Sequence, residues 1–259
     1  MRRLFVALSV AAVLALSASA ALAHDMWGTA DNPTPGQPLK AQIGYGHHYP
    51  AMEVIDDQEF TFFKLSVIGA GGPIKTSPGT PNYNFTTDAP VDKGTYLVVA
   101  DVAPIYWSQT PSGWSMKPKD ESPGATSCGL FIEGAKGVVV VGDDASAAVA
   151  TKPVGLPIEI VPLAHPSTVK PGGKLTLQVL LDGKPLAGAE VKGRYGAFST
   201  LASETAMAYS DTTDQEGKVT FVPLAAGDWI VTARSEKPFD QPTKCDKTDW
   251  GTSLHFIIN

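Results

Sequence analysis

Three of the five histidines in this chain, His24, His47 and His48, lie close together near its start. Imidazole is the commonest protein ligand for transition metals. If the chain is cut before His24, this residue carries a free α-amine beside its imidazole, and the two nitrogens can chelate one divalent ion. An imidazole from His47 or His48 would be the third nitrogen. The spacing therefore predicts a site for a divalent transition metal.

The His47-His48 pair offers one ligand more readily than two. Neighbouring residues of an extended strand point to opposite faces, so both rings reach one ion only if Gly46 and Pro50 hold the segment in a turn. The alternative to a metal site is a frayed terminus at His24 and an ordinary polar loop at the pair.

His255 is a further candidate metal ligand, although the alternation from Leu254 to Ile258 also fits a histidine on the solvent face of a last strand. His165, before Pro166, is interpreted as a loop residue. The acidic run from Asp56 to Glu59 lacks the spacing of a calcium-binding loop and is interpreted as a solvated loop.

Aromatic residues Tyr106, Trp107 and Trp114 lie in the Pro/Ser/Gly-rich stretch 104–123. They predict packing against a sheet, with a ligand lid or a sugar-stacking face as the alternative. No serine or cysteine nucleophile can be placed beside a histidine base, so the sequence predicts no enzyme.

The first residues have the layout of a secretory signal peptide. Arg2 and Arg3 precede an apolar stretch from Leu4 to about Ala20, and a small-x-small site predicts a cut after Ala23. The alternative is a retained membrane anchor. No later stretch is long and apolar enough to span a membrane, so we expect residues 1–23 to be removed and the product to be a periplasmic protein that is not itself membrane-spanning.

Composition indicates an ordinary globular protein with many turns. The chain has 25 Gly, 21 Pro and a formal net charge of −6, and an acidic chain without basic runs argues against nucleic acid as a partner. Cys128 and Cys245 predict one disulfide in an exported protein. Two unpaired buried thiols and, less readily, a thiolate metal site are the alternatives.

Alternating apolar residues predict an all-β protein with two consecutive β-sandwich domains. The N-terminal β domain, with the metal site, spans residues 24–142 and includes strands at 39–45, 60–68, 95–102 and 136–141. Residues 143–155 are rich in small side chains and predict a linker or a crossing segment. The second domain, residues 156–259, suits an immunoglobulin-like or transthyretin-like sandwich. Its strands are expected at 175–181, 185–191, 218–221, 228–234 and 253–258, with a hairpin turn at Asp182-Gly183.

Several segments together resemble the DUF4198 family, exported proteins described as periplasmic components of cobalt or nickel uptake systems. They are His24–Trp27, Gly46–Pro50, Gly94–Tyr96, Ala135–Gly142 and His165–Val191. The resemblance implies a metal-related role. His165 departs from the family pattern, where another polar residue is expected, and gains no weight from it. The stretch 214–231 also resembles a carboxypeptidase-regulatory β-sandwich repeat, which supports the fold only.

Three functions remain open at this stage. The first is a periplasmic metal-binding protein that captures nickel or cobalt, or presents it to a membrane metal-uptake transporter, with copper or zinc as further possible ions. The second is a structural or adhesive β module without a small ligand. The third is a copper oxygenase, because polysaccharide monooxygenases also use an N-terminal histidine with a second histidine; the chain does not resemble those enzymes.

Overall fold

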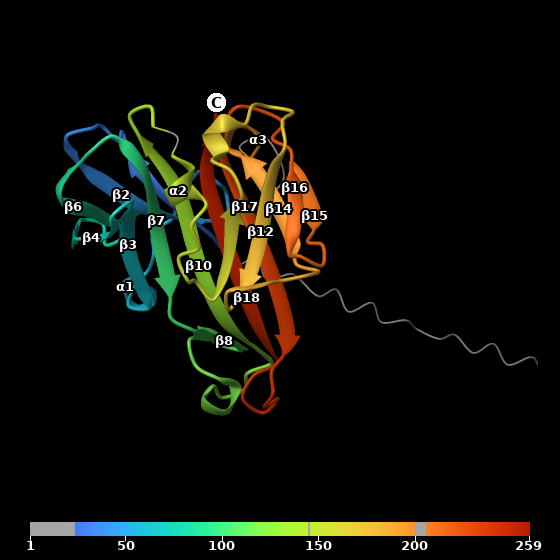
Figure 1. Cartoon of the computed structure of the whole chain (residues 1–259). Helices are drawn as coiled ribbons and strands as arrows, with labels where there is room; N and C mark the ends of the chain where they lie inside the picture. The colour runs from blue at the N-terminus through green and yellow to red at the C-terminus, as the bar shows by residue number, and fades with distance from the viewer. Residues whose placement is uncertain (1–23, 145, 200–205) are drawn as a thin grey trace, which may run out of the picture.

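The structure is a computed structural model, which describes residues 24–144, 146–199 and 206–259. Most regular elements in these ranges are β-strands, so the predicted all-β sandwich fold is confirmed (Figure 1). The predicted signal peptide, with its cut after Ala23, lies outside the described residues. No helix within those ranges is long and apolar enough to cross a membrane.

The largest of the three sheets formed by these residues has ten strands and lies at the centre of the molecule. These strands are β3 (Phe63–Gly69), β4 (Gly72–Ile74), β7 (Gly94–Val102), β8 (Ile105–Thr110), β9 (Gly113–Ser115), β10 (Ser127–Val141), β14 (Glu190–Tyr195), β15 (Tyr209–Thr212), β17 (Gly227–Pro238) and β18 (Lys247–Ile258). Eight follow one another in the order β15-β14-β17-β18-β10-β7-β3-β4, while β8 pairs with β10 and β9.

Both halves of the chain contribute to this central sheet. Their junction is the parallel pair of β10 and β18, which runs from Gly129 opposite Lys247 to Gly137 opposite His255. The strands lie side by side in the middle of the view (Figure 1). The two halves on either side of residues 143–155 therefore share one continuous sheet.

A four-stranded sheet covers one face of the central sheet, over its N-terminal half. Its order is β1-β2-β6-β5. Alternate residues of the second strand, Leu39, Ala41 and Ile43, pack with Val98 and Val139 of the central sheet. The four strands are β1 (Asp25–Asp31), β2 (Gln37–Gly46), β5 (Thr76–Pro78) and β6 (Asn84–Val91).

A second small sheet covers the opposite face. Leu97 and Val99 of β7 belong to the hydrophobic core beneath this sheet, which we call the second core. Val98 and Ala100 belong to the core beneath the β1-β2-β6-β5 sheet, which we call the first core. Since successive strand residues point to opposite faces, the two small sheets lie on different sides of the central one. The second small sheet contains β11 (Ile158–Pro162), β12 (Leu175–Leu181), β13 (Lys184–Pro185) and β16 (Lys218–Phe221).

Each helix among the described residues is a single turn. They are α1 (Asp57–Phe60), α2 (Ala147–Ala150), α3 (Gly196–Ser199), η1 (Lys119–Glu121) and η2 (Pro166–Thr168). The strand expected at 60–68 begins only at Phe63, because the Asp56 side chain accepts a hydrogen bond from Gln58 N at 2.8 Å and caps α1.

Two further expectations from the sequence are corrected. The segment 143–155 is more than a linker, because Val149 and Ala150 of α2 are buried in the second core. The strand expected at 185–191 is interrupted: β13 ends at Pro185, Gly188 adopts a φ of 74°, and β14 begins at Glu190. A glycine tolerates this left-handed conformation without the steric cost of a side chain.

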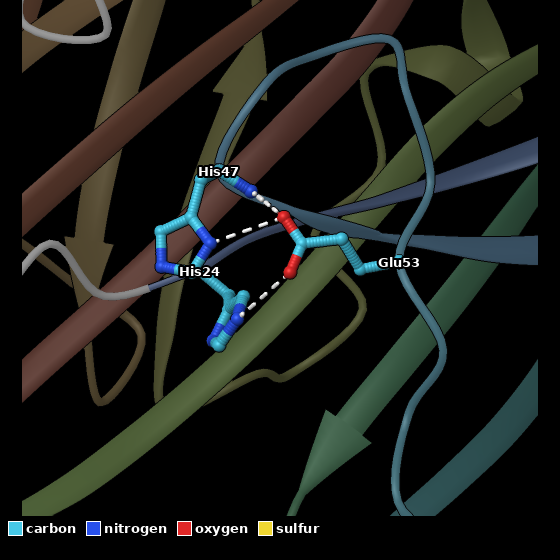
Figure 2. Close-up of side chains that lie close together, drawn as sticks. All are labelled: His24, His47 and Glu53. Atoms are coloured by element: carbon cyan, nitrogen blue, oxygen red, sulfur yellow. Dashed lines mark hydrogen bonds and ion pairs between the residues drawn. The ribbon is translucent and has the colours of Figure 1, made fainter.

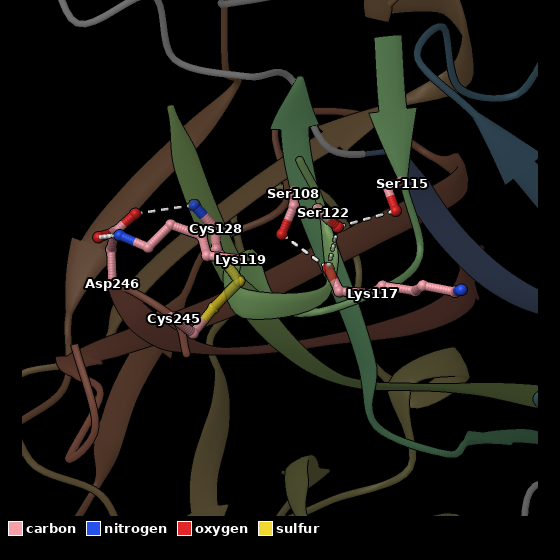
Figure 3. Close-up of a disulfide and its surroundings, with 8 residues drawn as sticks. All are labelled: Ser108, Ser115, Lys117, Lys119, Ser122, Cys128, Cys245 and Asp246. Carbon is pink, nitrogen blue, oxygen red and sulfur yellow. Dashed lines mark hydrogen bonds and ion pairs between the residues drawn. A yellow bond between two sulfur atoms is a disulfide. The ribbon is translucent and has the colours of Figure 1, made fainter. Parts of the chain in front are cut away.

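The predicted disulfide between Cys128 and Cys245 is present and joins residues 117 positions apart. Polar contacts surround it (Figure 3). Asp246 accepts a hydrogen bond from Cys128 N at 2.8 Å and pairs with Lys119. Ser108 donates to Lys117 O at 2.7 Å in the adjoining hairpin. The bridge thus fastens the start of β10 to the segment before β18.

Candidate metal centre

His24 and His47 are brought together by the pairing of β1 with β2. In this antiparallel register Asp25 lies opposite Gly46. The residue before β1 therefore lies beside the residue after β2, and these are His24 and His47. Their ring centroids are 3.9 Å apart.

Glu53 is the third member of the cluster and comes from the loop that follows β2. Ala51 N donates to His48 O at 2.7 Å and Glu53 N donates to Tyr45 O at 2.7 Å, so the loop turns back toward the strand. Its carboxylate then lies between the two histidines (Figure 2). Oε1 is 3.0 Å from His47 Nδ1 and accepts from His47 N at 2.8 Å, and Oε2 is 3.4 Å from His24 Nε2.

The three side chains form a plausible ligand set for one divalent ion. One ligand atom from each of His24, His47 and Glu53 lies within 4.8 Å of the other two. Two neutral imidazoles and one carboxylate suit transition metals of borderline softness. Between 31% and 42% of each side chain is exposed, so an ion can reach them from solvent.

The electrostatic environment keeps two of the ligands in the protonation state that metal binding needs. Burial, and then the neighbouring His47, lower the pKa of His24, which favours a neutral ring with a free lone pair. The pKa of Glu53 is also lowered, chiefly because the backbone N–H of His47 donates to its carboxylate.

Aromatic and charged residues hold the site in place. The Tyr45 ring stacks on His24 with centroids 4.2 Å apart, and its hydroxyl donates to Glu59 Oε1 at 2.7 Å. Asp25, the first residue of β1, pairs with Arg194 of β14. This ion pair ties the start of β1 to the C-terminal half of the central sheet.

A small recess lies beside His24 and contains Glu133 and Arg234. Glu133 Oε1 is 3.6 Å from an Arg234 guanidinium nitrogen. Burial raises the pKa of Glu133 to about 7, against the smaller opposing effect of Arg234. The carboxyl therefore changes charge near neutral pH.

The remaining histidines lie outside this cluster. His48 follows His47 but is exposed and does not belong to the set. His255 is 5% exposed, so the alternative that it lies on the solvent face of the last strand is wrong. Its Nε2 lies 3.6 Å from Asp228 Oδ1. His165 is buried and caps η2 through Ser167 N, so it is not an ordinary loop residue.

Other sequence features are also placed by the structure. Trp107 packs against the first core, as expected. The Trp114 ring lies edge-on to the Trp107 ring, and this residue is 55% exposed. Sequence reasoning missed Glu53. The signal available in the sequence was a carboxylate six residues after His47. A tight loop that turns at Pro50 can bring a residue at this separation back beside the end of the strand.

The fold and the site together define an all-β sandwich protein with a surface cluster of side chains that could hold a metal ion. The chain belongs to the family described as Domain of unknown function (DUF4198), which matches residues 21–237. No curated protein sequence matches it.

Solved structures show only distant similarity. The chain is 13% identical to the BSP domain of a biofilm associated protein, with a TM-score of 0.22, and the match covers 90% of this chain and 29% of that one. The D0-D1 domain of intimin is 15% identical, with a TM-score of 0.22 and coverage of 90% and 97%. Immunoglobulin domains 1–4 of Sidekick-1 are 11% identical, with a TM-score of 0.20 and coverage of 92% and 49%. Similarities at this level define neither a shared fold nor a function.

Proposed function

We propose that this protein is a periplasmic metal-binding protein that captures nickel or cobalt and presents it to a membrane uptake transporter. The observation that carries the proposal is the cluster of His24, His47 and Glu53, whose ligand atoms lie within 4.8 Å of one another. The disulfide supports an oxidising compartment such as the periplasm.

The donor set suits several divalent ions. Affinity at nitrogen and oxygen sites generally rises from cobalt through nickel to copper and is lower for zinc than for copper. The donors alone therefore do not select nickel or cobalt. The choice of these two ions comes from the resemblance to exported proteins described as parts of cobalt or nickel uptake systems.

Removal of residues 1–23 would add a fourth donor. In the precursor the nitrogen of His24 is an amide bonded to Ala23, and an amide is a poor ligand. After cleavage it is an amine on the same residue as the imidazole. It can chelate an ion together with Nδ1 of that ring once the ring turns this nitrogen toward Glu53, which Nε2 faces in the structure. The complete site would then arise only after export.

Exposure of the ligands supports a role in delivery rather than storage. Three protein side chains leave coordination positions open on a divalent ion that takes four to six ligands, and the solvent-facing side of the cluster is where a partner's ligand can enter. A site of this kind can release its ion by ligand exchange.

The test is a calorimetric titration of the protein that begins at His24 with nickel, cobalt, copper and zinc. We expect one ion per chain with micromolar or tighter affinity. A form with one glycine added before His24 serves as the matched control, because it keeps every side chain but converts the amine to an amide. It should bind at least tenfold more weakly, a loss of about 1.4 kcal/mol.

Each result has a clear meaning. Equal affinity of the two forms would remove the amine from the ligand set and leave the three side chains. An absence of binding by all four ions would contradict the proposal and favour a structural or adhesive module.

A further inference from the structure

The central sheet opens between its two middle strands, at the end away from the disulfide. β10 and β18 are paired as far as Gly137 and His255. Beyond this point β10 continues to Val141 with β7 as its strand partner, and β18 continues to Ile258 with β17. Beyond Gly137 and His255, the facing edges of β10 and β18 therefore have no strand partner, although they lie in the interior of the sheet.

A cavity of about 460 Å³ occupies this opening. Its walls are residues 138–140 of β10 and 255–257 of β18, and we call it the strand slot. Thr29 and Ala30 of β1 line it from one face of the sheet, and His165 and Ser167 line it from the other. The slot is separate from the metal centre.

His255 belongs to the lining of the strand slot, but its unpaired ring nitrogen is closed off from the slot. The residue is 5% exposed, and its Nδ1 is buried and has no hydrogen-bond partner among the described residues. Its Nε2 lies 3.6 Å from a carboxylate oxygen of Asp228. The Tyr49 hydroxyl is a second buried group without such a partner, and the centroid of its ring lies 6.2 Å from that of His255.

His165, on the opposite side of the slot, differs in this respect. Its Nδ1 accepts from Ser167 N at 3.2 Å, and its Nε2 lies 3.1 Å from the Thr95 hydroxyl. Both of its ring nitrogens are therefore engaged within the chain.

The charge of the strand slot is negative. Asp143 and Asp144 line it, and no lysine or arginine does among the described residues. Asp143 is paired with Lys93, which also interacts electrostatically with Asp144, so this lysine compensates one of the two negative charges. Such a lining attracts a cationic group and disfavours an anionic one.

We propose that the strand slot binds an extended basic peptide segment, which inserts between β10 and β18 as an additional strand. Strand backbones without a neighbour bind extended peptides through main-chain hydrogen bonds. At this interior position both edges of the peptide would be paired. A basic side chain of the peptide would lie near Asp144.

The test uses fluorescence anisotropy with the chain that begins at His24 and a labelled six-residue peptide. The peptide alternates valine and threonine and carries one lysine. We expect saturable binding that weakens at least tenfold when the lysine is replaced by glutamate. Methylation of the central peptide nitrogens, which removes main-chain donors without altering the protein, should weaken binding by at least the same factor.

A protein variant locates the site. Ile257 is 50% exposed at the wall of the slot, and Leu224 is 63% exposed on the loop between β16 and β17. Ile257→Lys places a cation in the slot and should weaken binding at least tenfold, whereas the matched control Leu224→Lys should leave it unchanged. Binding should also slow hydrogen exchange at residues 138–140.

Three outcomes would overturn the proposal. The first is no binding of any peptide at millimolar concentration. The second is equal binding of the methylated and parent peptides. The third is displacement of the peptide by an equal concentration of lysine amide, which would identify an amine pocket and exclude strand insertion.

Discussion

At the scale of single residues, the candidate metal centre depends on the position of one carboxylate. Glu53 accepts from the backbone of His47 and lies within 3.4 Å of an imidazole nitrogen of His24. This arrangement lowers the pKa of the carboxyl and places a negative charge where a cation would bind. The histidines alone provide two imidazole nitrogens, and Glu53 adds a carboxylate with a negative charge.

Glu133, in the recess beside His24, leads to a prediction about pH. Its folded-state pKa is raised from 4.5 to about 7 by burial. The group therefore favours the folded state most below pH 4.5, and this contribution is lost as the pH rises through 7. Glu133→Gln removes the dependence and should stabilise the metal-free protein more at pH 8 than at pH 5, by no more than about 3 kcal/mol.

The measurement is thermal or urea unfolding in a chelator at both pH values. Glu216→Gln, at an exposed glutamate far from the recess, is the control and should show no difference between them. A stabilisation by Glu133→Gln that is equal at pH 5 and pH 8 would show that the carboxyl does not titrate in this range.

The histidines of the cluster were candidates from the sequence, whereas the carboxylate was not among them. His24 and His47 were candidates by residue type and closeness along the chain. Glu53 depends on the backbone turn closed by Ala51 and His48, and no periodic pattern encodes that turn. His255 was a candidate by type alone, and its burial beside Asp228 reflects tertiary contacts of β17 and β18.

At the scale of elements, β1 positions the site because it bridges the two halves of the molecule. Its start pairs with β2 and is anchored to β14 through Asp25 and Arg194. Further along, Gly28 crosses directly over Gly137 of β10. A Cβ on Gly137 would lie 1.8 Å from Gly28 O, and one on Gly28 would lie 2.2 Å from Val98 O.

This crossing predicts that neither glycine tolerates a side chain. Gly28→Ala and Gly137→Ala should each lower the free energy of unfolding by at least about 2 kcal/mol, because backbone atoms would have to move. Gly71→Ala is the matched control, since a Cβ there meets no atom within 4 Å. Its effect should stay within about 0.5 kcal/mol. Denaturant unfolding measures all three, and a similar small effect at each position would contradict the close approach.

The elements themselves were predicted with uneven success. The strand at Leu175–Leu181 and the one at Lys218–Phe221 agree with the expected alternation. The start of β3 was misplaced because the cap at Asp56 favours a helical turn over an extended chain. Local side-chain hydrogen bonds of this kind override a β-prone composition.

At the scale of the whole molecule, the parallel pair of β10 and β18 unites the two halves. It joins residues more than a hundred positions apart, so its register depends on contacts that no local pattern contains. The sequence predicted two β sandwiches and their disulfide. The continuity of the central sheet between them, and the burial of α2, emerged only from the three-dimensional arrangement.

The disulfide should contribute substantially to stability. It closes a loop between positions 117 apart. Closing a loop of this length lowers the conformational entropy of the unfolded chain and so adds about 4 to 5 kcal/mol to the free energy of unfolding. Replacing both Cys128 and Cys245 by alanine should lower the free energy of unfolding toward that amount and leave metal affinity unchanged. Added reductant should destabilise the parent protein but not the variant. Two reactive thiols in the unreduced protein would contradict the bridge.

The central claim is that His24, His47 and Glu53 bind one metal ion together, and its most direct test is the nickel affinity of Glu53→Gln. Glutamine keeps an acceptor for His47 N but lacks the charge and ligand strength of the carboxylate. Calorimetry should show at least tenfold weaker binding, or about 1.4 kcal/mol, with unchanged unfolding in a chelator. Glu216→Gln should bind as the parent does. Equal nickel affinity of Glu53→Gln and the parent protein would contradict the claim.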